Sequence, residues 1–152
     1  MKQFVSSEIC AECRSCCRFN APSWGPQLMT EDKNPLGLAE IKLVRSGHEF
    51  VCEFLNQNNN DCQVYEKRPF ECVMYPFLLI RRIDTLDLAA HLACPYVKEM
   101  IGYEQFKKYS EYLISYLKEP KMMRTLNDNV EIFYQYPEIE LFVIKRDVLE
   151  KK

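Results

Sequence analysis

One stretch of the chain, "YEQFKKYSEYLISYLKEP", places residues of one face at intervals of three and four. These positions are Tyr103, Phe106, Ser110, Leu113 and Leu117. The spacing is typical of a helix that packs one side against a core. Pro120 follows the pattern, and proline ends such a run because it cannot continue the backbone hydrogen bonds. The pattern therefore predicts a helix that ends at Pro120.

A second helical pattern occupies "MTEDKNPLGLAEIKLVRSG". Its apolar positions, roughly at helical spacing, are Leu38, Ile41, Leu43 and Val44. Thr30 and Glu31 resemble capping residues, and Gly47 stops the run. We expect a helix over about 36–46.

The segment around Cys72 predicts a short helix followed by a hairpin. Pro69 suits the first turn of a helix and Pro76 ends it, which leaves roughly two turns that carry Cys72. The apolar runs that follow, at about 77–83 and 86–92, are separated by a short polar turn. They predict two antiparallel strands.

Alternating positions near the C-terminus predict two more strands. The first set is Val130, Ile132, Tyr134 and Tyr136, and the second is Ile139, Leu141 and Val143. Pro137 lies between them, at a break or on a sheet edge. Helices and hairpins together predict an α+β fold, a small single domain over 1–152 with several helices and a small antiparallel sheet.

Composition and charge narrow the function. The chain has 152 residues, and 47% hydrophobic composition is enough for one core without disulfides. The net charge of −2 gives no basic surface for nucleic acid or for an acidic membrane. The longest apolar run, "VMYPFLLI" at 73–80, is too short to cross a bilayer, and "MKQFVSSEIC" lacks a signal-peptide core. We expect a cytoplasmic protein that binds neither nucleic acid nor membranes.

The cysteines carry the strongest chemical signal. They form C-x2-C-x2-C-C, then C-x9-C-x9-C, then C-P, at Cys10, Cys13, Cys16, Cys17, Cys52, Cys62, Cys72 and Cys94. In a reducing compartment, clustered cysteines hold metal or perform redox chemistry more often than they form structural disulfides. The eight thiols are the predicted metal ligands.

The C-x2-C spacing suits metal binding, because a short loop can turn two thiolates toward one ion at a Zn–S distance of about 2.3 Å. Eight thiolates divide into two sites of four ligands. Cys16 and Cys17 are adjacent and point apart, so one of them serves a second site or is a free reactive thiol. Thiolates suit zinc, Cu(I) and iron–sulfur clusters alike, so the spacing leaves the metal open.

Three residues between Cys62 and Cys72 are candidates for a supporting shell. A zinc ion with four thiolates carries about two negative charges, which the Arg68 guanidinium can offset through hydrogen bonds to sulfur. Tyr65 serves as a proton relay or as a packing residue. Glu66 acts as an acid or base near the metal, or is a solvated carboxylate that pairs with Arg68 on the surface.

These motifs resemble a known family. The C-x2-C-x2-C-C opening, "VCEFL" at 51–55 and "CQVYEKRPFECVMYP" at 62–76 are similar to the CxxCxxCC domain family, the YkgJ-like proteins, which is named for chelation of zinc or iron. The resemblance covers about residues 8–96 and leaves 97–152 as a C-terminal helix and strand pair. It implies the first seven cysteines as ligands, and Cys94 fits a later C-P of the family.

Three hypotheses follow. The first is a metal-binding protein that holds zinc or iron, including a 4Fe-4S cluster, and that stores or delivers the metal or docks a protein partner. The second is an iron–sulfur enzyme or accessory protein for redox or group transfer, because the cysteine pattern also resembles that of the flagellin lysine-N-methylases. The third is a thiol redox pair formed by Cys16 and Cys17.

Overall fold

The computed structural model describes residues 1–13, 16–137 and 139–150, which separate into two compact units. The cysteine unit is the continuous stretch Val5–Val73. The sheet unit combines Met1–Phe4 with Met74–Lys152. Each unit contains helices and one antiparallel three-stranded sheet, which confirms the predicted α+β class. Packing units are not independently folding domains, so the single domain stays a prediction.

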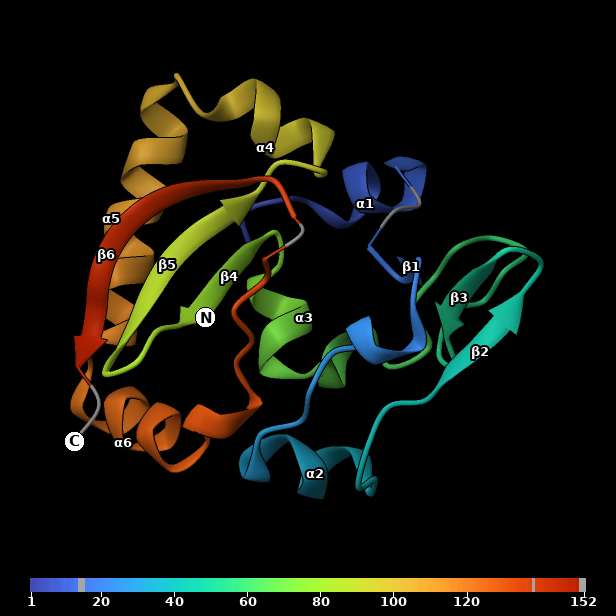
Figure 1. Cartoon of the computed structure of the whole chain (residues 1–152). Helices are drawn as coiled ribbons and strands as arrows, with labels where there is room; N and C mark the ends of the chain where they lie inside the picture. The colour runs from blue at the N-terminus through green and yellow to red at the C-terminus, as the bar shows by residue number, and fades with distance from the viewer. Residues whose placement is uncertain (14–15, 138, 151–152) are drawn as a thin grey trace. The chain divides into compact units, whose positions relative to one another are not determined.

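Short elements build the cysteine unit (Figure 1). They are α1 (Ser7–Cys13), β1 (Arg18–Phe19), the 3-10 helix η1 (Pro22–Trp24), α2 (Thr30–Leu36), β2 (Leu43–Ser46), β3 (Glu49–Cys52), the 3-10 helix η2 (Tyr65–Lys67) and α3 (Phe70–Met74). The strand order is β1-β3-β2. Ser46 pairs with Glu49, so Gly47 and His48 form a two-residue turn, in which Gly47 has a φ of +64° that favours glycine.

The helix predicted over 36–46 is wrong, although its capping residues are correctly placed. α2 begins at Thr30 and ends at Leu36, and Gly37 follows with a φ of +69°. The Gly37 N–H donates to the Lys33 carbonyl at 2.8 Å, which closes the last turn. The apolar residues 43–44 instead start β2, because pairing with β3 satisfies their backbone groups.

The cysteine unit has a small buried cluster that includes one of the thiols. The cluster is Leu28, Ile41, Val51, Cys52 and Leu55. Cys17 is partly buried and packs against it. The apolar cluster therefore includes one candidate metal ligand, Cys52, and contacts another, Cys17.

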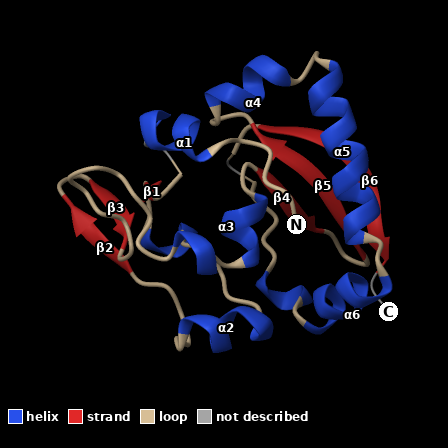
Figure 2. Cartoon of the chain, turned by 180° about the vertical axis from the view of Figure 1, so that it is seen from behind, coloured by secondary structure: helices blue, strands red, loops and turns tan. Residues whose placement is uncertain are grey.

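The sheet unit contains longer elements. They are β4 (Phe77–Arg81), β5 (Thr85–His91), α4 (Pro95–Met100), α5 (Glu104–Leu117), α6 (Pro120–Asp128), the 3-10 helix η3 (Val130–Ile132) and β6 (Leu141–Glu150). The sheet order is β4-β5-β6, and α5 lies across one face of the sheet (Figures 1 and 2). No helix in the described ranges is both long and apolar enough to cross a membrane.

Three predicted elements are confirmed. α3 lies between Pro69 and Pro76 and carries Cys72, and β4 and β5 form the predicted antiparallel hairpin. α5 is the predicted amphipathic helix, whose buried face is Phe106, Ser110, Leu113 and Leu117. Tyr103 departs from the prediction: it precedes the helix as the N-cap residue and is 60% exposed.

Of the two predicted C-terminal strands, the first is wrong and the second is confirmed from Leu141 onward. The segment 130–136 begins as η3, and the Tyr134 carbonyl accepts a hydrogen bond from the Arg81 N–H at 2.9 Å. One strand, β6, runs from Leu141 to Glu150 and pairs with β5. The sequence pattern also misses α6, for which Pro120 occupies the first turn, a position where proline needs no N–H partner.

A buried carboxylate fixes an irregular part of the sheet. Asp87 on β5 is 3% exposed, and its Oδ1 accepts the Asp147 N–H at 3.0 Å while Oδ2 accepts Arg82 Nε at 2.9 Å. Asp147 lies in β6 with a φ of +50°. The two strands are held together at this point through one side chain.

Asp87→Asn is expected to lower the free energy of unfolding by about 1–2 kcal/mol, because the amide loses the charge that Arg82 neutralises and one acceptor oxygen. Urea denaturation followed by the helical signal measures the change. The control is Asp84→Asn in the exposed turn of the same hairpin, which should shift stability by less than about 0.5 kcal/mol. Equal effects of the two substitutions would contradict this role.

Candidate metal centre

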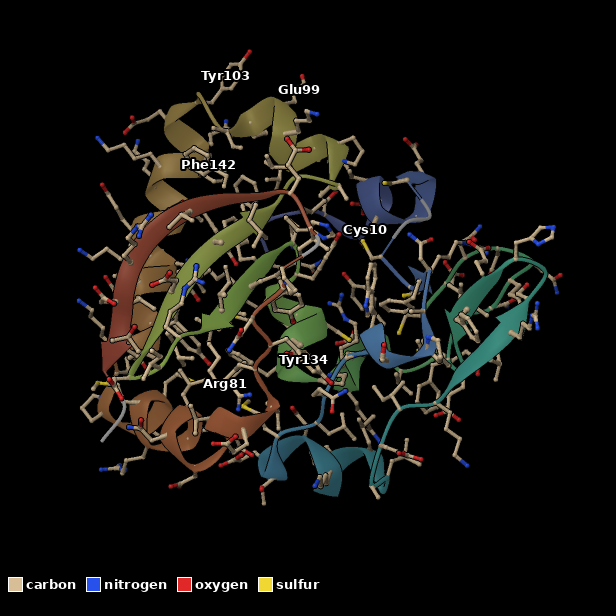
Figure 3. The ribbon with its side chains drawn as sticks, in the orientation of Figure 1. Cys10, Arg81, Glu99, Tyr103, Tyr134 and Phe142 are labelled. Carbon is tan, nitrogen blue, oxygen red and sulfur yellow. The ribbon has the colours of Figure 1, made fainter. Side chains whose placement is uncertain are left out.

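The first two cysteines lie on a helix, not on a loop as expected from the C-x2-C spacing. Cys10 and Cys13 belong to α1, in which residues three apart share one side. Both are partly buried. The Cys10 N–H donates to the Ser6 carbonyl at 3.1 Å, and Figure 3 labels its side chain on α1. The short helix thus presents two thiols together.

Strand pairing brings Cys17 beside Cys52. Arg18 of β1 pairs with Val51 of β3 in an antiparallel register, so the preceding residue, Cys17, lies opposite Cys52. The Cys52 N–H donates to the Cys17 carbonyl at 3.0 Å. The two thiols are 35 positions apart in the sequence, and the sheet makes them neighbours.

A reversal after β3 returns the chain to the same place. Leu55 forms an antiparallel bridge with Cys62, and the Leu55 N–H donates to the Cys52 carbonyl at 2.9 Å. The Gln63 N–H donates to the Phe54 carbonyl at 2.9 Å. The polar run "NQNNND" at 56–61 lies between them and forms the tip of this reversal.

The charges of four thiols act on one another. Burial raises the pKa of Cys17 to about 12, and the negative charges of Cys52 and Cys62 raise it further. Burial also raises the pKa of Cys72 well above its ordinary value, with added repulsion from Cys17, Cys52 and Cys62. Burial raises the pKa of Cys52 in the same way. These thiols, Cys17, Cys52, Cys62 and Cys72, are named the thiol quartet.

Cys10 and Cys16 form a different group. A hydrogen bond with the Cys16 side chain lowers the pKa of Cys10 to about 7, against the effect of burial, and the positive charge of Arg68 lowers it further. The negative charge of Cys10 also raises the pKa of Cys17, so Cys10 lies near the quartet as well. Cys10, Cys13 and Cys16 are named the α1 group.

Of the three predicted supporting residues, the structure joins two. The Arg68 guanidinium stacks over the Tyr65 ring at 3.6 Å from its centroid, and Arg68 Nε donates to the Tyr65 carbonyl at 2.9 Å. Arg68 is near enough to both thiol groups for its charge to act on Cys10 and Cys17. Glu66 is exposed on η2.

Sequence reasoning did not identify Asp32 as part of this region, and it did not include Glu71 among the predicted site residues. Asp32 accepts the Phe70 N–H at 3.1 Å, which holds the start of α3, and Glu71 accepts the Gln27 N–H at 2.7 Å. Burial raises the pKa of Glu71 to about 7, and the charge of Asp32 raises it further. The only sequence feature that pointed to Glu71 is its position directly before Cys72.

The remaining candidate, Cys94, is buried in the sheet unit directly before α4. Within the described ranges, no three Cys, His, Asp or Glu side chains are arranged as a ready metal-ligand group. The four thiols of the quartet are therefore close enough for their charges to interact, but they are not arranged as a closed coordination sphere. Its donor chemistry nevertheless fits a thiophilic metal, because thiolates are the preferred ligands of zinc and of iron–sulfur clusters.

A comparison with protein families decides the assignment. A family model described as "CxxCxxCC: Putative zinc- or iron-chelating domain" matches residues 9–112, more than half of the chain. The chain belongs to the CxxCxxCC family. No curated protein and no solved structure matches it. The CxxCxxCC match covers both thiol groups and Cys94, and it supports metal binding as the general function.

Proposed function

We propose that the cysteine unit holds zinc or iron through the thiol quartet, with the α1 group as additional ligands. The observation that carries this proposal is the convergence of Cys17, Cys52, Cys62 and Cys72 from separate segments of one unit, near enough for their charges to interact. Repulsion among four thiolates is unfavourable without a cation. A bound metal ion would offset that repulsion, because each thiolate is attracted to the cation.

Arg68 supports the same proposal. Four thiolates leave a divalent site with about two excess negative charges, and a guanidinium offsets part of them. The stack on Tyr65 and the bond to its carbonyl fix the position of Arg68. We propose that Tyr65 acts by holding Arg68.

The position of Glu66 supports the second of its two predicted roles. Its exposure on η2 favours a solvated carboxylate over an acid or base at the metal. The prediction of Cys94 as a ligand rests on its C-P motif alone, so the proposed site is limited to the thiols of the cysteine unit. The proposed activity is that of a metal-binding module that stores or delivers its metal or docks a protein partner.

Metal analysis with a visible spectrum, on the full chain purified without oxygen, tests the proposal. We expect at least one metal ion per chain. Zinc without colour supports a closed thiolate site, whereas iron with acid-labile sulfide and broad visible absorption supports a cluster. Substoichiometric metal, both as purified and after reconstitution with zinc or with iron and sulfide, would contradict the proposal.

A further inference from the structure

The N-terminal segment inserts an aromatic ring into the sheet unit. Phe4 contacts the rings of Phe77, Tyr96, Phe106 and Tyr109 at centroid distances of 5.5, 5.6, 5.9 and 4.9 Å. Two of these contacts are edge-to-face, an arrangement that aromatic pairs favour. The ring therefore anchors the chain immediately before the cysteine unit begins.

The backbone of the same segment is tied to α5 by two tyrosine hydroxyls. The Lys2 N–H donates to the Tyr112 hydroxyl at 2.7 Å, and the Tyr109 hydroxyl donates to the Lys2 carbonyl at 2.7 Å. The Lys2 ammonium also lies 6.0 Å from the centroid of the Tyr112 ring. Met1–Phe4 is thus a docked segment, named the N-terminal clasp.

The clasp makes the cysteine unit a closed loop of the chain. The unit leaves the sheet unit after Phe4 and returns at Met74, and Phe4 touches Phe77 at the start of β4. Both ends of Val5–Val73 are therefore attached to neighbouring points. Docking of Phe4 fixes the chain three residues before α1, which lowers the conformational entropy that ordering α1 costs.

We propose that the N-terminal clasp positions α1, so that Cys10 and Cys13 are available as ligands only when Met1–Phe4 is docked. This inference rests on the proposed metal function. α1 begins three residues after Phe4, so an anchored ring restricts the volume that both thiols can reach. The tyrosines of α5 act on the metal site through the chain, as positioning residues.

The test is residue-specific alkylation of the full chain loaded with zinc, using iodoacetamide and mass spectrometry. Bound thiols react slowly, because the thiolate is held by the metal. Tyr109→Phe/Tyr112→Phe removes both hydroxyls that hold Lys2 and leaves the rings in place. We expect alkylation of Cys10 and Cys13 to accelerate about tenfold, because the loss of two hydrogen bonds raises the fraction of molecules with an undocked clasp by about that factor. The alkylation rate of Cys52 should not change.

Tyr116→Phe is the matched control. Tyr116 lies on the same side of α5 and contacts the Tyr112 ring at 6.3 Å, and no bond to Lys2 depends on its hydroxyl. It should leave alkylation of Cys10 and Cys13 within about twofold of the wild type. Unchanged rates in the double variant, or equal acceleration in the control, would overturn the proposal.

A second variant, Phe4→Ala, removes the anchoring ring and should give a larger acceleration. Phe142→Ala is its control, because Phe142 contacts the same aromatic group through Phe106 at 6.0 Å and lies far from the N-terminus in sequence (Figure 3). The helical signal of α5 shows that the sheet unit remains folded. A folded Phe4→Ala protein with wild-type rates would also overturn the proposal.

Hydrogen exchange of α1 in the metal-free chain separates the two proposals. If the wild type takes up no metal, the proposed function fails, and hydrogen exchange of α1 alone then tests the clasp. Faster exchange of Ser7–Cys13 in Tyr109→Phe/Tyr112→Phe than in Tyr116→Phe supports a clasp. Equal exchange in both variants refutes it.

Discussion

Replacing Cys72 with serine is expected to lower the affinity of the cysteine unit for zinc by about two orders of magnitude. Binding of structural zinc contributes about 12 kcal/mol, or about 3 kcal/mol for each of four ligands, and 1.4 kcal/mol corresponds to tenfold. Serine is nearly the same size, but its hydroxyl is a poor ligand for a thiophilic metal. Competition with a chromophoric chelator measures the dissociation constant.

Cys94→Ser provides the comparison, because Cys94 is also buried but belongs to the sheet unit. It should leave zinc affinity within about threefold of the wild type, since burial alone does not make a ligand. An equal loss in both variants would place Cys94 in the ligand set and contradict a site made by the quartet. Near-wild-type affinity in Cys72→Ser would remove Cys72 from the set.

The sequence predicted best those elements whose pattern and end signals are local. α3 lies between two prolines, and the buried positions of α5 repeat at helical spacing up to Pro120. The β4–β5 hairpin joins two adjacent apolar runs. In each case, neighbouring residues determine both the element and its limits.

Prediction failed where distant pairing or a missed helix start decided the structure. Leu43 and Val44 fit a helical spacing, but a hairpin with β3 satisfies their backbone groups. Pro120 was predicted only to end α5, but it also begins a second helix, α6. The chain continues from α6 into η3, so the strand expected at 130–136 does not form. Apolar spacing alone does not distinguish these outcomes over short segments.

The candidate site was likewise predicted only where the signal is local in the sequence. Cysteine spacing identified the thiols and "EKRP" identified Arg68, because these residue types carry their chemistry in the sequence. The grouping of the thiols depends on the register between β1 and β3, which aligns Cys17 with Cys52. Asp32 could not be linked to α3 from the sequence, since its bond to the Phe70 N–H spans 38 residues.

Removing the metal should unfold the two units to very different extents. The buried cluster of the cysteine unit is small and includes Cys52, whereas α5 packs on a sheet with its own apolar core. Small cores commonly need a metal or disulfide for stability. At a free metal concentration a thousandfold above the dissociation constant, binding stabilises the folded state by about 4 kcal/mol.

We therefore expect a strong chelator to accelerate amide hydrogen exchange in β3 and α3 by about three orders of magnitude, the factor that 4 kcal/mol represents. Exchange in α5, measured on peptides from the same sample, should change by less than about threefold and is the internal control. A uniform acceleration across both units would show that the metal stabilises the whole chain. No acceleration in β3 would mean that the cysteine unit is stable without metal, and its thiols would then need a role other than holding the fold together.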